Sequence, residues 1–243
     1  MKKSILSWST GKDAAYSLLK LVQNGKKPGL LLTNINQSKE RVSMHGSRLE
    51  LLKLQAERLN IPLYIIPLHE EINMEDYNRI TADHLKKLRT KGFTNIYFGD
   101  IFLEDLKNYR IKQMNAVGLN SGFPIWGENT SELAQKIIDS GIKAVITAVS
   151  ADKMDKSFVG RTFDRSFLND LPEGVDWCGE NGEFHSFVYD HPLFSSPIEW
   201  KKGEIVFKKY KKCTKEDKNK FSSGNEKEKT WDTGFWYIDI LKK

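Results

Sequence analysis

The residues nearest the N-terminus that can do chemistry form a short loop between an apolar run at residues 5–8 and a helical pattern at 13–23. Its members are Ser7, Trp8, Ser9, Thr10, Gly11, Lys12 and Asp13. Small residues let successive backbone N–H groups turn toward one point, where the positive end of the next helix also attracts anions. Lys12 adds a mobile ammonium, and Asp13 is suited to hold magnesium (Mg²⁺) or to complement the helix dipole. The loop is not a Walker A motif, since Asp13 follows the lysine. It predicts phosphate binding, with a well-capped turn as the plainer alternative.

Further polar side chains follow other predicted strands. Gly99 and Asp100 come directly after a strand at residues 95–98, and Arg110 lies in the helical segment that comes next. Ligands of parallel sheets bind outside the carboxyl ends of the strands. We therefore expect Asp100 to contact a ligand. Arg110 is suited to clamp a phosphate or a carboxylate, with an exposed helical arginine as the alternative.

A glycine-rich segment near residue 180 carries two carboxylates and an imidazole. Its glycines bracket a turn that contains Glu180 and precedes Glu183, and His185 begins the strand pattern that follows. The turn predicts that both acids reach one cleft. Neighbouring carboxylates raise one pKa, which suits a base that works near neutral pH. The alternative is a glycine-rich hairpin with solvated acids.

Strand and helix patterns alternate along the first 150 residues. Strand patterns occupy residues 5–8, 29–35, 63–67, 95–98 and 143–149, and helical patterns occupy 13–23, 47–59, 74–89, 106–117 and 130–139. Strands separated by helices of about 10–15 residues indicate right-handed βαβ units and a parallel sheet. The sequence therefore predicts an α/β fold with a doubly wound, mostly parallel, Rossmann-like sheet.

The alternation ends near residue 151, and we place a domain boundary there. Residues 1–150 then form the phosphate-binding domain, and residues 151–243 form a smaller appended region that caps the carboxyl edge of the sheet. The strand patterns of that region lie at 185–189, 204–209 and 236–241. A lysine-rich loop at about 201–230 interrupts it. We interpret this loop as a solvated excursion, with an RNA-contacting patch as the alternative.

Charge and composition narrow the classes of function. The net charge is +6, but residues 201–229 hold eleven lysines against five acids, and the rest of the chain balances 27 against 27. This distribution argues against a nucleic acid as the partner. Two cysteines, Cys178 and Cys213, are too few for a zinc site or a disulfide framework. No apolar run approaches the roughly 20 residues of a membrane span, so we expect a cytoplasmic protein.

Taken together, the separated motifs resemble the diphthine–ammonia ligase family, a branch of the PP-loop (HUP-like) enzymes. The N-terminal loop is similar to the PP-loop, whose usual form is Ser-Gly-Gly-Lys-Asp-Ser, with Thr10 in place of a Gly and Ala14 in place of a Ser. The stretches RVSMHG at 41–46, Gly99-Asp100 and DWCGENGEFHSFV at 176–188 follow in the family's order. The resemblance covers nearly the whole chain and fades between 201 and 231.

The resemblance implies an ATP-dependent ligase that joins a carboxylate to ammonia through an acyl-adenylate, with release of AMP and pyrophosphate. The implied catalytic residues are Lys12, Asp13, Glu180, Glu183 and His185. The implied ATP-binding residues are Ser7, Ser9, Thr10, Gly11, Lys12, Asp13, His45, Gly99, Asp100 and Arg110, and Asp13 and Asp100 are the implied ligands of Mg²⁺. Gly160 and Arg161 match a further family feature and are expected to contact the nucleotide or the acceptor. The expected partners are ATP, ammonia and an unidentified carboxylate acceptor, and a homodimer stays open.

Two other functions also stay open. Other PP-loop proteins modify tRNA, but sulfur transfer uses paired cysteines, and Cys178 and Cys213 form no evident pair. A sensor that binds ATP without turnover is favoured by Thr10 and Ala14, because the first crowds the loop and the second removes a hydroxyl.

Overall fold

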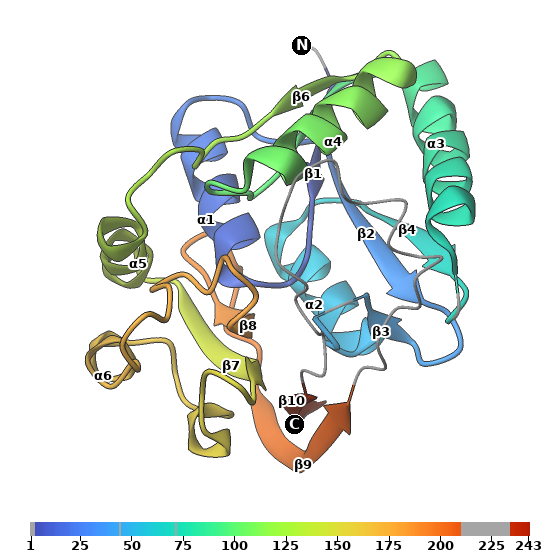
Figure 1. The fold of residues 1–243 in the computed structure, drawn as a ribbon. Coiled ribbons are helices and arrows are strands. Elements are labelled where there is room, and N and C mark those ends of the chain that lie inside the picture. The colour runs from blue at the N-terminus through green and yellow to red at the C-terminus, as the bar shows by residue number, and fades with distance from the viewer. Residues whose placement is uncertain (1–2, 44, 71, 210–233) are drawn as a thin grey trace.

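Two β-sheets of different design organise the chain (Figure 1). The structure is a computed structural model that describes residues 3–43, 45–70, 72–209 and 234–243. None of the helices in these residues is long and apolar enough to cross a membrane. The first sheet positions the phosphate loop, and the second sheet covers that loop from the other side.

The first sheet is mostly parallel, as the sequence predicts. Its parallel strands are β1 (Lys3–Ser7), β2 (Leu30–Asn36), β4 (Leu63–Leu68), β5 (Phe93–Tyr97) and β6 (Asn120–Gly122). β1 lies between β2 and β5, β4 pairs with the other edge of β2, and β6 extends the sheet beyond β5. The short β3 (Arg41–Val42) pairs antiparallel with the end of β2. The carboxyl ends of β1 and β5 are therefore neighbours, which brings Ser7 and Gly99 to one edge.

Helices cover both faces of this sheet, so the fold is doubly wound. Neighbouring residues of a strand point to opposite faces, and Ile5 and Leu6 of β1 accordingly lie in two separate apolar clusters. The cluster around Leu6 holds α1 (Lys12–Gln23) and α2 (Leu49–Leu59). The cluster around Ile5 holds α3 (Met74–Thr90) and α4 (Glu104–Ala116).

The second sheet is antiparallel, with strand order β8-β7-β10-β9. Its strands are β7 (Lys143–Ser150), β8 (Phe184–Asp190), β9 (Trp200–Lys209) and β10 (Gly234–Lys242). The strand at 143–149, which we assigned to the parallel sheet, belongs here instead. Seven of its eight residues are buried, and a continuous apolar run does not distinguish a parallel strand from a central antiparallel one.

Helix α5 (Thr130–Asp139) precedes β7, and its bounds are those that the sequence predicts. Gly141 follows it with φ of +84°, the left-handed conformation that favours glycine after a helix end. The pattern did not reveal the short elements: β3, β6, a 3-10 helix at Lys156–Phe158 and α6 (Arg165–Asn169). Each is too brief to show a period.

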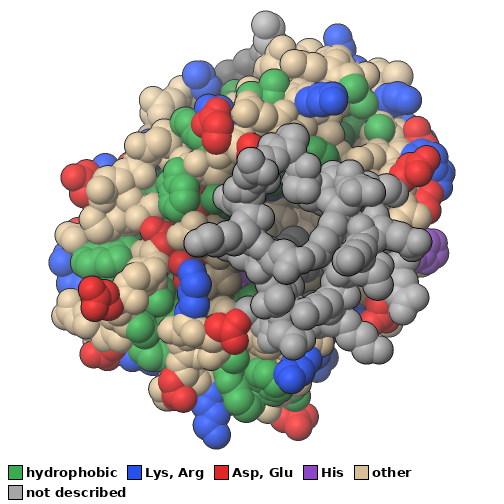
Figure 2. Space-filling model, in the orientation of Figure 1, with side chains coloured by type: hydrophobic (Ala, Val, Ile, Leu, Met, Phe, Trp, Pro, Cys, Tyr) green, Lys and Arg blue, Asp and Glu red, His purple; other side chains and the backbone are tan. Residues whose placement is uncertain are grey.

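The lysine-rich stretch divides into two parts. Residues 204–209 lie in β9, as the strand pattern predicts, and β9 also includes residues 201–203, so the expectation of a loop from about residue 201 is wrong. The rest of the stretch lies outside the described residues. On the face shown in Figure 2, acidic and basic side chains are interspersed rather than gathered by sign.

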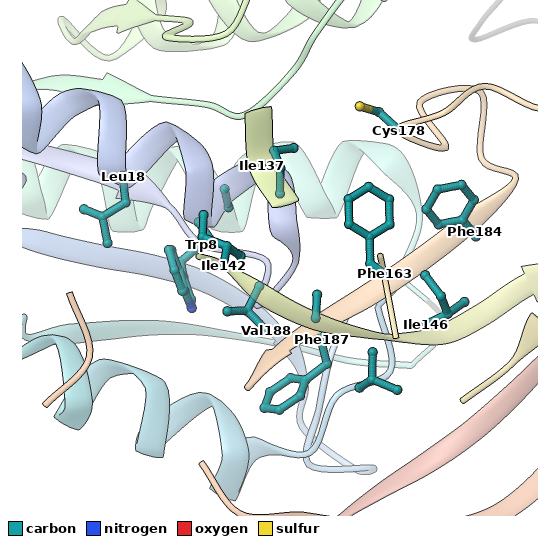
Figure 3. Packing of buried hydrophobic residues seen from close by; sticks show 14 of the residues in the cluster. Trp8, Leu18, Ile137, Ile142, Ile146, Phe163, Cys178, Phe184, Phe187 and Val188 are labelled. Atoms are coloured by element: carbon teal, nitrogen blue, oxygen red, sulfur yellow. The ribbon is translucent and has the colours of Figure 1, made fainter. Parts of the chain in front are cut away.

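The two sheets share one apolar core. A single cluster contains Trp8 next to the phosphate loop, Leu18 of α1 and Phe187 of β8, and Figure 3 shows these residues with Val188 between the sheets. The polar side chain of Gln55 crosses the same region. Its Nε2 donates to the carbonyls of Thr10 (3.1 Å) and Val188 (2.6 Å), while its Oε1 accepts from the Trp8 indole at 2.8 Å. The three hydrogen bonds of Gln55 therefore fix α2, the loop at residues 7–13 and β8 to one another.

Candidate active site at the N-terminus of α1

The phosphate loop, residues 7–13, turns from β1 into α1 through a strained residue. Thr10 has φ of +73° and is fully buried. The left-handed region is unfavourable for a β-branched residue. Surrounding bonds hold it there: its carbonyl accepts the Val188 N–H at 2.9 Å, and its hydroxyl lies 2.8 Å from Ser47 Oγ. The loop therefore keeps a glycine-like turn where the PP-loop usually has Gly.

The opening of α1 has the features of an anion site. Gly11 is the N-cap residue and supplies no capping side chain. Unpaired N–H groups of a first turn attract anions, together with the helix dipole. Ser9 is close to this turn, since its Oγ accepts the Gly11 N–H at 3.4 Å. A side chain at position 11 would be crowded, because a Cβ there would lie 3.2 Å from the His45 ring and 3.3 Å from the Ser186 carbonyl oxygen.

Lys12 is buried, with 2% of its surface exposed, and it is fully paired. Its ammonium donates to both carboxylate oxygens of Asp13, at 2.9 and 3.0 Å, and to the backbone carbonyl of Cys178. Burial by itself would lower the pKa of Lys12, but Asp13 outweighs it and the net pKa is raised. Lys12 therefore carries a positive charge at neutral pH.

Strand β8 contributes a residue that sequence reasoning missed. The Ser186 hydroxyl accepts the backbone N–H of Lys12 at 3.2 Å, so it satisfies one donor of the first helical turn. Ser186 is 2% exposed and lies in a pattern that reads as an ordinary strand. Gln55 was also missed as a functional position, although a lone polar residue on the apolar side of α2 was a signal for it.

His45 and His185 form a pair of rings beside the loop. Their centroids are 4.6 Å apart, and His45 Nδ1 is buried without a hydrogen-bond partner in the described structure. Burial, with His185 nearby, lowers the pKa of His45 well below its usual value, and burial lowers the pKa of His185 to about 4. Both rings are neutral at physiological pH and line the loop on the side of Gly11.

The end of β5 approaches α1 very closely. A Cβ on Gly99 would lie 3.0 Å from the backbone nitrogen of Ala14, so only glycine fits there. Asp100 follows, and its carboxylate pairs with Arg110 of α4, with 2.6 Å between Nε and Oδ2. The Arg110 guanidinium also lies over the Phe98 ring at 4.5 Å. Arg110 is therefore held by Asp100 at the sheet edge rather than freely exposed.

Glu180 reaches the same edge from the C-terminal half of the chain. Its Oε1 accepts the N–H of Ile101 at 2.8 Å. The pKa of Glu180 is raised to about 7, mainly by burial and also by Asp13 and Asp100, while the Ile101 N–H opposes the rise. A carboxyl group that titrates near neutral pH can accept a proton from a bound substrate.

Glu183 does not share that position, which corrects the expectation that both acids reach one cleft. Glu183 is fully buried, and its Oε1 pairs with Lys153 at 3.2 Å and accepts from Asn181 at 3.3 Å. The raised pKa of Glu180 accordingly arises from burial and from the acids of the first sheet, and not from Glu183. The two acids lie apart because Glu183 directly precedes β8 and is buried with that strand, whereas Glu180 lies on the preceding turn.

Asp176 organises the turn that carries Glu180. Its Oδ1 accepts the N–H groups of Cys178 (3.0 Å) and Glu180 (3.1 Å). Its own N–H lies 3.4 Å from Glu183 Oε1. The sequence motif at 176–188 contains Asp176 but does not reveal this role, because the partners of Asp176 are backbone groups that a pattern of side chains does not show.

Gly160 and Arg161 occupy structural positions. Gly160 has φ of +81° and packs against β10, where a Cβ would lie 3.1 Å from Ile238. Arg161 pairs with Asp170 at 2.7 Å and lies over the Phe158 ring at 5.2 Å. None of these contacts joins either residue to the phosphate loop.

The residues at the start of α1 fit a phosphorylated ligand with its metal. The first turn offers N–H donors and the ammonium of Lys12. The Asp13 side chain is 26% exposed, so it can face a cation. Mg²⁺ commonly binds one or two carboxylates together with phosphate oxygens. Within the described residues, no group of three or more His, Cys, Asp or Glu side chains is arranged to hold a metal ion.

Comparison with known proteins identifies relatives over both halves of the chain. A family model described as "Diphthamide synthase N-terminal domain" matches residues 1–122, and "Diphthamide synthase C-terminal domain" matches residues 129–243. The chain is 25% identical to a Homo sapiens protein named "Diphthine--ammonia ligase", with 82% of each chain covered. It is 26% identical to a protein of the same name from Schizosaccharomyces pombe, with 86% of this chain and 39% of that protein covered.

Solved structures also match the chain, and one of them shows how distant the likeness is. It is described as "predicted subunit of tRNA methyltransferase" from Methanocaldococcus jannaschii, with 14% identity and a TM-score of 0.41, over 82% of this chain and 100% of that one. The family matches, by contrast, span the phosphate loop, the end of β5 and the Glu180 turn in a single order. The chain belongs to the diphthamide synthase family.

Proposed function

We propose that this protein is an ATP-dependent carboxylate–ammonia ligase that forms an acyl-adenylate and releases AMP and pyrophosphate. One observation carries the proposal: the Lys12–Asp13 loop at the start of α1 lies within electrostatic reach of Glu180, a carboxyl group whose pKa is raised to about 7. A phosphate-binding loop serves the first half-reaction, and a near-neutral base serves the second. Relatives named "Diphthine--ammonia ligase" support this pairing of activities.

In the first half-reaction, an oxygen of the acceptor carboxylate attacks the α-phosphorus of ATP. The bond between the α-phosphorus and the bridging oxygen breaks, and pyrophosphate leaves with that oxygen. The first-turn N–H groups and Lys12 stabilise the charge that develops on the phosphates. Asp13 and Asp100 would hold Mg²⁺, which neutralises phosphate charge. His45, neutral and beside Gly11, would line the nucleotide site.

In the second half-reaction, ammonia attacks the acyl carbon of the adenylate. A C–N bond forms, the bond to the AMP oxygen breaks, and AMP leaves with one proton from the attacking nitrogen on its phosphate. The nitrogen must lose one proton as an ammonium ion before it attacks. Glu180 would take that proton, because its carboxylate form exists near pH 7 and has an affinity for protons well above that of an ordinary glutamate. Burial of Glu183 assigns it a supporting role, in which it fixes the Glu180 turn.

The same reasoning assigns a different role to each sheet. We propose that the parallel sheet binds ATP and that the second sheet, including β7, presents the acceptor side of the site. The acceptor that the relatives' name points to is diphthine, a modified histidine with a carboxylate. We propose a cytoplasmic location for a ligase with that acceptor. The residues named above all come from one chain, so the proposed site does not require a homodimer.

The test is acceptor-dependent formation of AMP and pyrophosphate. Purified protein, MgATP, ammonium chloride and a diphthine-bearing elongation factor are combined, and nucleotide products are separated by chromatography. We expect AMP and pyrophosphate in equal amounts, and loss of both in Lys12→Ala and Asp13→Ala. Lys136→Ala, a change on the exposed face of α5, is the matched control and should retain turnover. Formation of ADP and phosphate instead would refute the proposal.

A further inference from the structure

The Lys12 ammonium occupies a cage built for a small cation. The cage has three oxygen acceptors, namely Oδ1 and Oδ2 of Asp13 and the carbonyl of Cys178. Two aromatic rings close it: Phe163 and Phe184 lie with their centroids 5.4 and 5.2 Å from the Lys12 nitrogen. Ring faces attract cations, and more strongly where water is excluded.

The walls of the cage are rigid and dry. Phe163, Phe184 and Cys178 are each 2% exposed, and Figure 3 shows the three at one end of the shared core. Asp176 holds the Cys178 turn through its backbone. The occupant, by contrast, sits on a flexible four-carbon stem. A rigid cage around a movable ammonium differs from an ordinary surface ion pair, whose two side chains both move.

The proposed function requires Lys12 to leave this position. Phosphate oxygens of a nucleotide compete for the Lys12 ammonium with charge greater than that of Asp13. When Lys12 moves to the phosphates, the Asp13 carboxylate, the Cys178 carbonyl and the two rings lose their cation. An anionic, desolvated cavity without a counter-ion is unfavourable. Asp13 has two oxygens, so binding of Mg²⁺ to one leaves the other in the cage.

We propose that this cage, vacated by Lys12 when the nucleotide binds, is the binding site of the ammonium substrate. The inference rests on the proposed function and names where its second substrate enters. Ammonium repeats the N–H geometry of the lysine head group, with N–H bonds to the Asp13 oxygen that Mg²⁺ leaves free and to the Cys178 carbonyl, and with the two rings around it. Nucleotide then binds before ammonium, because Lys12 blocks the cage until it is drawn away.

The position of Glu180 completes the argument. Glu180 lies on the same turn as Cys178, whose carbonyl forms part of the cage, because Asp176 Oδ1 accepts the N–H groups of both residues. An ammonium ion there can transfer one proton to Glu180, which leaves neutral ammonia with its electron pair free to attack the adenylate. That proton moves to the Glu180 carboxylate. After the attack the nitrogen loses a second proton, which leaves on the phosphate of AMP, so no other reactant is needed.

The test uses Lys12→Ala, which empties the cage without nucleotide. Thermal unfolding of this variant is followed in ammonium chloride and in sodium, potassium and tetramethylammonium chlorides of equal ionic strength. We expect ammonium alone to stabilise the variant, by roughly 2–4 °C at about five times its Kd. Wild type should show no ammonium-specific shift until a non-hydrolysable ATP analogue is added. Lys136→Ala, which removes an exposed lysine from Glu128, should show none in any salt.

Equal shifts in sodium and ammonium would overturn the proposal, and so would an equal shift in potassium. If Lys12→Ala does not fold, the wild-type protein with the analogue decides, since ammonium-dependent stabilisation is expected there without any substitution. No arm of this experiment involves turnover. Failure of the pyrophosphate assay would therefore leave an ammonium shift standing, and absence of that shift would leave the ligase reaction standing with its ammonium site elsewhere.

Discussion

Replacing Glu180 with glutamine should make the protein more stable above neutral pH. Burial raises the pKa of Glu180 from 4.5 to about 7. The folded state therefore binds a proton more tightly than the unfolded state. Stability from this group is fully present below the unfolded pKa and is lost as pH rises through about 7. Glutamine keeps a side-chain oxygen for the Ile101 N–H but cannot ionise.

The magnitude follows from the size of the shift. A difference of about 2.5 pKa units corresponds to roughly 3 kcal/mol at a pH well above both values. Glu180 is partly exposed, and solvent screens part of this term, so we expect about 1–3 kcal/mol. The gain should be present near pH 8 and should fall toward zero near pH 5.

Urea unfolding of wild type and Glu180→Gln at both pH values measures the effect. Glu132→Gln provides a matched control, because the Glu132 side chain is 69% exposed and should give no such pH dependence. The same Glu180→Gln protein should lose most ligase turnover while it gains stability. If the two variants differ from wild type by the same amount at both pH values, Glu180 ionises like a surface glutamate and the reasoning about its role fails.

Three further substitutions test the contacts that hold the loop and the two sheets in place. Thr10→Gly should be more stable than Thr10→Ala by about 1 kcal/mol in chemical unfolding. Both variants lose the hydroxyl, but only glycine adopts the positive φ of position 10 without strain. If Thr10→Ala were the more stable variant, position 10 would be unstrained. Gly99→Ala should lower stability by about 1–3 kcal/mol and weaken nucleotide binding in calorimetry, since its Cβ would meet the backbone of α1 at 3.0 Å; unchanged values of both would contradict this packing. Burial opposes ionisation of Asp239, but Arg48 and Arg41 outweigh it and lower the pKa of Asp239 to about 2. Asp239→Asn should therefore lower the unfolding free energy by about 1–2 kcal/mol at neutral pH. This loss of stability relative to wild type should shrink as pH falls from about 4 toward 2. A loss that does not depend on pH would exclude the ion pair as its cause.

The parts of the fold set by local pattern were predictable from the sequence. The helix of Thr130–Asp139 and the turn at Gly141 follow from spacing and from glycine after a helix end. The partner of β7 did not follow, because a fully apolar strand fits either type of sheet. The strand pattern also gave no sign that β8 would cross the start of α1.

The candidate site divides in the same way. Lys12 and Asp13 are neighbours in sequence, so their place together at the start of α1 was predictable, and phosphate binding there stays a prediction. Ser186 and the Cys178 carbonyl reach Lys12 only through pairs 174 and 166 residues apart. The bond from Lys12 to Cys178 is accepted by a backbone oxygen, and the position of a backbone oxygen cannot be inferred from residue types. Glu183 was misplaced for a related reason, since its distance from Glu180 in sequence says nothing of which sheet covers it.

These long-range pairs change how the second sheet should be understood. Val188 bonds the carbonyl of the strained Thr10, and Ser186 bonds the first N–H of α1. The conformation of the loop at residues 7–13 is thus held by β8 as well as by β1. A nucleotide that draws Lys12 away from Cys178 acts directly on the turn that carries Glu180. In the proposed mechanism, phosphate binding at the first sheet and proton transfer at the second would be coupled through the Lys12 side chain, which would give the two half-reactions an order without any movement of whole domains.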